Sequence, residues 1–165
     1  MSICEQNIRQ FLFRHIDQWT GLSADCKKSE IIALYPFNEG EGVTHFGVKN
    51  VEYQFRSLPF RGFSEAVFFY FVRDLLLSHI ATEFWSFDRR ECAEILRHIG
   101  EPTYRLDFAW KDRTIADGEL LYPDKGISIG VIPDTGLIGL VTVFAPCTET
   151  VYKEQYWNTK HSREF

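Results

Sequence analysis

The sequence predicts an α+β fold in which a helix followed by an antiparallel β-meander occurs twice in tandem. Three observations lead to this prediction. Residues 88–100 have the start signal, the apolar spacing and the stop of a helix. Apolar runs bounded by turn residues follow this helix, as expected for strands. A weaker copy of the same order lies upstream, so we expect two units, about 20–84 and 85–157, after an N-terminal helix over 3–19.

The chain length favours one domain. Its 165 residues fit a single domain. Neither unit is expected to bury its helix and sheet face alone, so we predict a single compact domain over 1–165 in which the two sheets join or stack. The composition, 45% hydrophobic and 16% aromatic, supplies enough apolar material for that core.

The first elements are predicted to be helices. Apolar side chains recur at helical spacing over 3–19, which indicates an amphipathic helix that Gly21 ends. A second helix follows, with Ser23 or Asp25 as its cap and Pro36 as its stop.

Strands are predicted next. Pro59 and Gly62 indicate a looser connection over Leu58–Ser64. Leu75–Thr82 is expected to pair with the preceding strand across a tight turn at Arg73-Asp74, although its apolar run is also compatible with a helix. The other strands expected in this unit are Val43–Val48, Val51–Ser57 and Glu65–Arg73.

The second unit has clearer signals. Asp88 and Glu91 have the spacing of a capping box, and Gly100 with Pro102 ends the helix. Its predicted strands are Leu120–Tyr122, Gly126–Val131 and Leu137–Phe144, and a short helix is predicted over Thr148–Trp157.

The two units match at several points. Glu30-Ile31-Ile32 resembles Glu94-Ile95-Leu96 at an offset of 64 residues. Val67–Asp74 resembles Ile127–Asp134 at an offset of 60. Insertions in loops produce such a drift between units, and chance matching of apolar runs is the alternative.

Several segments together resemble an uncharacterised family of small bacterial proteins. They are Trp19-Thr20-Gly21-Leu22, Ile99-Gly100-Glu101-Pro102, Tyr122-Pro123 with Gly126-Ile127, and Val143-Phe144-Ala145-Pro146. The tandem layout is similar to the repeats of the beta-lactamase inhibitor protein and of small outer-membrane lipoproteins. That resemblance implies a sheet face, rich in aromatic residues, that holds another protein. This chain departs from those relatives because a secretion signal, a lipidation cysteine and a disulfide framework are not evident in it.

Charge and the first residues limit the classes of partner and location. A net charge of −5 disfavours a phosphate-binding surface, so we expect no nucleic acid partner. Residues 1–5 do not resemble a signal peptide, and no apolar run is long enough to span a membrane, so we predict a cytoplasmic protein.

The four cysteines are scattered and are interpreted as small buried hydrophobes. They are Cys4, Cys26, Cys92 and Cys147.

No motif predicts catalysis, a metal or a cofactor. The histidines do not have metal-ligand spacing. A depressed pKa for Cys92, beside Arg89 and Arg90, is less well supported than a core position. Four carboxylates surround the predicted hairpin after residue 104, and we interpret them as solvated rather than as an acid–base pair. They are Asp107, Asp112, Asp117 and Glu119.

Aromatic and arginine residues on the predicted strands are the candidate partner-binding residues. Because residues two apart share a side of a strand, Tyr104, Leu106, Phe108 and Trp110 are expected on one side and Arg105 on the other. This aromatic side is either core or a face that binds a partner, since Tyr, Trp and Arg often anchor interfaces. The candidates are Tyr53, Arg56, Tyr104, Arg105, Trp110 and Tyr122.

Three functions compete at this stage. We favour a non-enzymatic protein-binding module, such as an immunity or inhibitor protein that blocks another protein, and an acidic chain suits a basic toxin or enzyme as that partner. The alternatives are a small-ligand-binding protein or enzyme with a pocket between the two units, and a structural assembly component. The sequence identifies neither the partner nor the oligomeric state.

Overall fold

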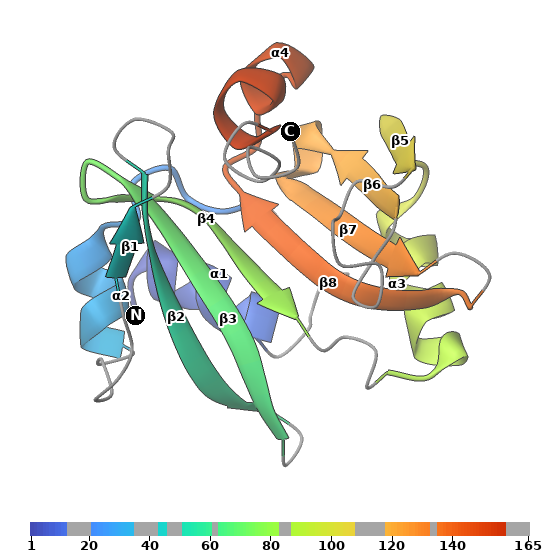
Figure 1. The fold of residues 1–165 in the computed structure, drawn as a ribbon, viewed down its shortest axis with the longest axis horizontal. Helices are drawn as coiled ribbons and strands as arrows, with labels where there is room; N and C mark the ends of the chain where they lie inside the picture. Colours follow the sequence, from blue (N-terminus) through green and yellow to red (C-terminus); the bar gives the residue numbers. More distant parts are fainter. Residues whose placement is uncertain are drawn as a thin grey trace.

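The structure, a computed structural model, describes residues 1–12, 21–34, 43–45, 51–60, 63–82, 87–107, 118–132 and 135–157. It is an α+β fold, and its eight described strands form one antiparallel sheet (Figure 1). The strand order across the sheet is β1-β2-β3-β4-β8-β7-β6-β5. Two consecutive meanders therefore meet at the centre of the sheet, where β4 pairs with β8.

Each meander contributes four strands. The first contains β1 (Val43–His45), β2 (Val51–Phe60), β3 (Phe63–Val72) and β4 (Leu75–Thr82). The second contains β5 (Tyr104–Asp107), β6 (Gly118–Tyr122), β7 (Ile127–Ile132) and β8 (Leu137–Phe144). At the junction, Ser78 of β4 lies opposite Phe144 of β8 and Thr82 lies opposite Leu140, so the two meanders share one hydrogen-bonded ladder.

Three helices share one side of this sheet, which we call the helix side; the opposite side is the far side. They are α1 (Ile3–Leu12), α2 (Lys28–Leu34) and α3 (Arg89–Ile99). Buried residues of all three helices belong to one hydrophobic core with buried residues of β3, β6, β7 and β8. This core joins Ile8, Ile31 and Cys92 of the helices to Phe69 of β3 and Ile129 of β7.

Alternation along the strands sets which residues face the helices. In β3, Val67, Phe69 and Phe71 are buried in the core, whereas Phe68 and Tyr70 between them are half-buried. Since successive strand side chains point to opposite sides, Phe68 and Tyr70 lie on the far side. Each fully buried side chain of this size contributes about 1.5–3 kcal/mol through burial.

The C-terminal segment packs on the far side of the second meander. It comprises α4 (Glu149–Val151) and the π-helical turn η4 (Tyr152–Trp157). The Tyr152 ring lies 5.2 Å from the Phe144 ring, centroid to centroid, in a second small core that includes Leu121. The short helix predicted over Thr148–Trp157 is confirmed, and the Thr148 hydroxyl caps it by accepting a bond from the Val151 N–H at 3.3 Å.

Both ends of α3 are fixed by side chains. The capping box is confirmed: the Asp88 carboxylate accepts from the Glu91 N–H at 2.8 Å, and the Glu91 carboxylate accepts from the Asp88 N–H at 2.9 Å. A cap of this kind is worth about 1 kcal/mol. At the other end, the Tyr122 hydroxyl donates to the Gly100 carbonyl at 3.0 Å. The Lys125 ammonium, from the short 3-10 turn η3 (Pro123–Lys125), donates to the Ile99 carbonyl.

The looser connection predicted over Leu58–Ser64 is wrong. β2 continues to Phe60 and β3 begins at Phe63, with Pro59 opposite Ser64. Proline is compatible with this position, because among the described residues β1 pairs only with residues 52–54 of β2 and no described strand pairs with Pro59 on that side.

The strand prediction for Leu75–Thr82 is confirmed and its helical alternative is wrong. Val72 pairs with Leu75 across a two-residue turn. Arg73 and Asp74 both have positive φ, 49° and 65°, as a type I′ hairpin turn requires. The Asp74 carbonyl accepts a 2.7 Å bond from the Lys28 N–H, which holds this strained turn against the start of α2.

Two expectations near the N-terminus need correction. α2 begins at Lys28, so neither Ser23 nor Asp25 is its cap; instead the Glu30 carboxylate accepts from the Lys27 N–H at 3.0 Å. Cys4 and Cys26 are not separate buried hydrophobes, because they form a disulfide. The spacing of the cysteines does not indicate this pairing, which depends on how α1 packs. The rest of the predicted first helix (residues 13–19), Pro36 and residues 46–50, between the first two predicted strands, lie outside the described residues.

Candidate protein-binding surface

The six predicted partner-binding residues do not form one surface. Tyr53 and Arg56 belong to β2, where they pair with Tyr70 and Val67 of β3, and their side chains lie outside the description. Trp110 also lies outside the described residues. The remaining three can be placed.

Tyr104 and Arg105 lie at the outer strand of the second meander. Tyr104 is half-buried and packs against the small far-side core of Leu121, Phe144 and Tyr152. The Lys153 ammonium lies 5.1 Å from the centroid of the Tyr104 ring, so the C-terminal segment already contacts this ring. The Arg105 side chain is exposed, and its guanidinium lies 3.4 Å from the carboxylate of Glu101.

Tyr122 is a core residue. It is 1% exposed, belongs to the helix-side core and holds the end of α3 through its hydroxyl. Burial raises the pKa of this phenol to about 12. Tyr122 and Tyr104 thus lie on opposite sides of the sheet, and Tyr122 does not belong to a partner-binding surface.

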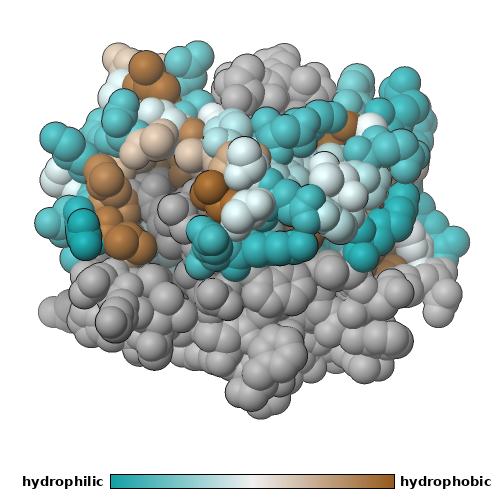
Figure 2. All heavy atoms as spheres, turned by 90° about the horizontal axis from the view of Figure 1, so that it is seen from above, coloured by the Kyte–Doolittle hydropathy of each residue, from teal (hydrophilic) through white to brown (hydrophobic). Residues whose placement is uncertain are grey.

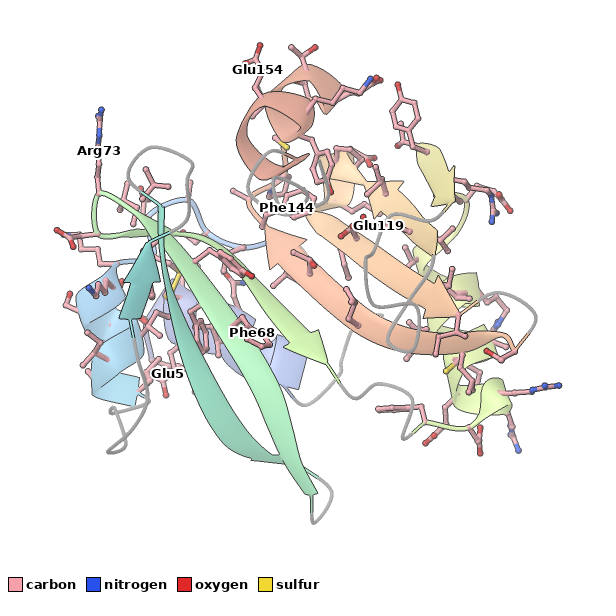
Figure 3. The ribbon with its side chains drawn as sticks, in the orientation of Figure 1. Glu5, Phe68, Arg73, Glu119, Phe144 and Glu154 are labelled. Atoms are coloured by element: carbon pink, nitrogen blue, oxygen red, sulfur yellow. A yellow bond between two sulfur atoms is a disulfide. The ribbon has the colours of Figure 1, made fainter. Side chains whose placement is uncertain are left out.

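The far side of the second meander is buried and partly polar. Glu119, Ser128, Thr142 and Tyr152 are each at most 2% exposed. Burial, and then the negative charge of Glu119, raise the pKa of the Tyr152 phenol well above its ordinary value. Glu119, labelled in Figure 3, is therefore not the solvated carboxylate that the sequence predicted. Asp112 and Asp117 lie outside the described residues, as does the side chain of Asp107.

The far side of the first meander differs from that of the second. Phe68, labelled in Figure 3, and Tyr70 are half-buried on β3. By register, Phe68 lies opposite Phe55 and Tyr70 lies opposite Tyr53 on β2. The corresponding strand of the second meander, β7, has the small residues Ser128 and Gly130 on this side, both buried. Partly exposed aromatic rings on the far side are therefore found on β3.

Sequence reasoning missed Phe68 and Tyr70. The run from Val67 to Val72 is apolar throughout, so period-two alternation is hidden in it. The one usable signal was the choice of side chain: Tyr70 is the single residue of this run with a polar tip.

The end of the molecule that carries α4 and η4 is mostly hydrophilic over its described residues (Figure 2). Hydrophobic residues gather at the left of that view, over the end where α2 and the β3–β4 turn lie in Figure 1. Leu75, just after this turn, is 43% exposed. No helix among the described residues is long and apolar enough to cross a membrane.

Thiols and metal ligands do not form a reactive centre in the described part of the chain. Cys92 is a core residue, as the sequence favoured, and burial raises the pKa of its thiol. Burial also raises the pKa of the half-buried Cys147 thiol to about 11. Groups of three or more metal-ligating side chains are not found among the described residues.

Comparison with solved structures gives a distant similarity. No family model matches the chain, and no curated protein matches it. A cysteine-rich secretory protein from Staphylococcus aureus subsp. aureus Mu50 is similar in structure, with 14% sequence identity and a TM-score of 0.48. The match covers 84% of this chain and 48% of that protein, so this chain spans about half its length. The similarity is distant and assigns no family.

Proposed function

We propose that this chain is a non-enzymatic protein-binding module, of the immunity or inhibitor type, that binds its partner through the far side of the first meander. One observation carries the proposal. β3 places Val67, Phe69 and Phe71 in the core but leaves Phe68 and Tyr70 partly exposed on the opposite side. Aromatic side chains in this position are typical anchors of protein interfaces.

The two meanders have different roles in this proposal. On the far side of the second meander, Tyr152 of the C-terminal segment is buried against Phe144 and Leu121, and the half-buried Tyr104 packs against this group. One half of the sheet therefore already binds an aromatic side chain, Tyr152, from a helical segment of the same chain. We propose that a partner binds the other half, where Phe68 and Tyr70 are partly exposed. Tyr53 of β2 remains a candidate contact, because it lies opposite Tyr70; Arg56 does not, because it lies opposite Val67, which belongs to the helix-side core.

The proposed partner is a protein with a basic surface. The chain has a net charge of −5, so a basic partner is attracted and oriented before contact. A basic toxin or enzyme meets this requirement. A cytoplasmic location stays a prediction. The Cys4–Cys26 disulfide disfavours it, because the cytosol keeps most disulfides reduced.

We also propose that the two meanders are an internal repeat. α2 precedes β1–β4 and α3 precedes β5–β8, so a helix followed by four strands occurs twice in the described chain. The two sets enter the sheet in opposite directions from its ends and meet at β4 and β8. An experimental structure in which the two sets superpose, with α2 on α3, is the expected result; helices that cross their meanders differently would contradict a repeat.

Photo-crosslinking tests the binding proposal. A benzophenone side chain at position 70 is expected to crosslink one basic protein in the cells that make this chain, and the same group at the exposed position 98 of α3 is the control. The captured protein, purified separately, should then bind the wild-type chain with Kd below about 1 µM. Equal capture from both positions, or capture of a second copy alone, would contradict the proposal. A stability increase with a small molecule and no crosslink would favour the ligand-binding alternative.

A further inference from the structure

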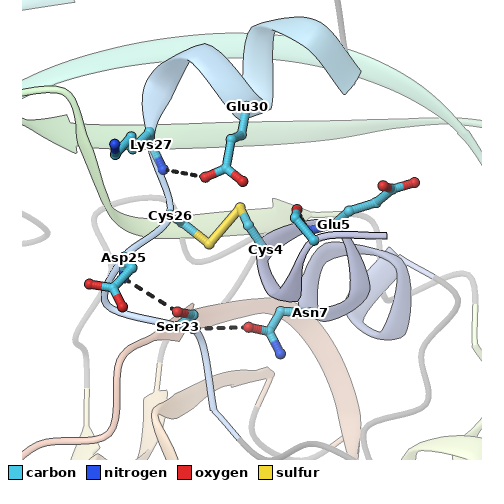
Figure 4. Close-up of a disulfide and its surroundings, with 9 residues drawn as sticks. Cys4, Glu5, Asn7, Ser23, Asp25, Cys26, Lys27 and Glu30 are labelled. Atoms are coloured by element: carbon cyan, nitrogen blue, oxygen red, sulfur yellow. Dashed lines mark hydrogen bonds between the residues drawn. A yellow bond between two sulfur atoms is a disulfide. The ribbon is translucent and has the colours of Figure 1, made fainter.

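The N-terminal helix is joined covalently to the segment 21–28, which we call the strap. Cys4, in the first turn of α1, forms a disulfide with Cys26 of the strap (Figure 4). Their Cα atoms are 5.2 Å apart, within the usual span of a disulfide. Both cysteines are buried, at 3% and 1% exposure.

The strap is anchored to the sheet by its own backbone. The Leu22 N–H donates to the Phe144 carbonyl at 3.2 Å, at the end of β8. The Lys28 N–H donates to the Asp74 carbonyl at 2.7 Å, and Lys27 forms an isolated bridge with Leu75. The strap therefore contacts both meanders through bonds that do not involve the disulfide.

The described contacts of α1 with the strap lie on one helical face. The Asn7 side chain accepts a 2.9 Å bond from the Ser23 N–H, and Asn7 follows Cys4 by three residues (Figure 4). Ile8, on the next position, is fully buried in the helix-side core. Met1 and Ile3, at the start of α1, are 86% and 67% exposed. The helix thus begins at the surface and is held through Cys4 and Asn7.

We propose that the Cys4–Cys26 pair is a redox latch on α1. In the oxidised state the bond fixes α1 to the strap. In the reduced state the strap keeps its backbone bonds to β8 and the β3–β4 turn, whereas α1 is left with noncovalent contacts and opens more often. The oxidation state of the pair therefore controls how often the core around Ile8 is uncovered.

The exchange step needs a dithiol as reductant. One thiolate of the dithiol attacks the Cys4 or Cys26 sulfur, breaks the S–S bond and forms a mixed disulfide. The second thiol of the reductant then displaces the protein sulfur. Two electrons pass to the protein, which ends with two thiols, and the dithiol becomes a cyclic disulfide. Because both cysteines are buried, attack requires the first turn of α1 to open.

The effect of the latch is expected to be large and local. In the loop-entropy account, a closed loop of this size lowers the population of states in which residues 4–26 are open by a factor on the order of 100. The change should appear in α1 rather than in α3, because the caps of α3 involve neither cysteine.

Hydrogen exchange of the full chain tests the latch. Thiol titration in denaturant should first detect two reactive thiols in protein purified without reductant and four after dithiothreitol. On reduction, amide exchange in residues 4–12 should accelerate at least tenfold, while exchange in 90–99 stays within twofold. The Cys4→Ser/Cys26→Ser double variant should match the reduced protein, and Cys147→Ser is the control that should keep the oxidised pattern.

Three results would overturn the latch. They are four reactive thiols without reductant, unchanged exchange in α1 on reduction, and a uniform acceleration across the sheet. Because reduction of the wild-type chain is itself an arm of the experiment, the test does not depend on the double variant folding.

Discussion

Residues on the two sides of β6 pack in different cores, and Tyr122 shows this most clearly. Its ring belongs to the helix-side core, and its hydroxyl reaches the carbonyl of Gly100 at the end of α3. The neighbouring Leu121 faces the other way and packs with Tyr152. A single shift of register would exchange these environments, so the alternation along β6 is well specified.

The bond from Tyr122 is open to a direct test. Tyr122→Phe removes the hydroxyl that donates to Gly100 while keeping the buried ring, so we expect a loss of about 1 kcal/mol in the free energy of unfolding. Urea denaturation measures it. Tyr104→Phe is the matched control, because Lys153 contacts the face of that ring and the ring is retained. Equal losses in both variants would show that the Gly100 bond does not stabilise the protein.

Deprotonation of the Cys147 thiol is expected to lower the free energy of unfolding at alkaline pH. Burial raises the pKa of its thiol from 9.0 to about 11, so between these values the unfolded chain loses its proton first. The folded state then binds more protons, and stability falls as pH rises from 9 to 11. Cys147→Ser removes this contribution, so its free energy of unfolding should fall by about 1–2 kcal/mol less than that of the wild type between pH 9 and pH 11. The expected difference is smaller than the full pKa shift implies, because the thiol is only half-buried. Urea midpoints at pH 8, 9, 10 and 11 measure it, and parallel curves would contradict it.

At the scale of elements, two glycines with similar backbone angles have different surroundings. Gly126, with φ of 63°, follows η3, and an added Cβ would lie 2.2 Å from the Phe144 carbonyl oxygen. Gly136, with φ of 70°, precedes β8, and an added Cβ would meet no atom within 4 Å. Both positions favour glycine through φ, but at Gly126 the neighbouring backbone also excludes a side chain.

Alanine at these two positions separates the two effects. Gly136→Ala should cost about 1–2 kcal/mol through the left-handed backbone alone. Gly126→Ala should cost about 4 kcal/mol or more, since the backbone of β8 would have to move. Denaturation of both variants measures the difference. Losses within 1 kcal/mol of each other would mean that η3 and the end of β8 are not packed as closely as described.

The sequence predicted elements best where local chemistry decides them. The capping box at Asp88 and the short helix over Thr148–Trp157 are decided by local sequence, and both are confirmed. The Leu58–Ser64 connection was wrong because Pro59 is accommodated within the β2–β3 pairing, opposite Ser64, and this pairing is a property of the sheet. The Cys4–Cys26 bond and the burial of Glu119 also depend on packing between distant elements, so no local pattern reveals them.

The candidate site was less predictable than the fold. Of the predicted alternation, the structure describes only Tyr104, which packs on the far side, and the exposed Arg105; the pattern could not show that the C-terminal segment contacts the Tyr104 ring. Tyr122 was assigned to a surface and lies in the core. Phe68 and Tyr70 were hidden in a uniformly apolar run.

At the scale of the whole molecule, one sheet has a buried helix side and two unlike halves on its far side. The second half is closed by Tyr152 and its segment, whereas the first half carries partly exposed aromatic rings on β3. The chain is acidic, with a net charge of −5, which adds long-range attraction to a basic partner. The proposed binding function depends on this difference between the halves.

The affinity of paired tyrosine variants for the crosslinked partner tests that claim most directly. Tyr70 and Tyr104 are both half-buried on the far side, one in each meander. Tyr70→Ala should raise Kd about 30-fold, equivalent to the loss of an interface anchor of about 2 kcal/mol, and Tyr104→Ala should change Kd less than threefold. Urea midpoints of both variants establish that each is folded. An unchanged Kd for Tyr70→Ala with a weakened Tyr104→Ala would place the binding surface on the second meander and contradict the account.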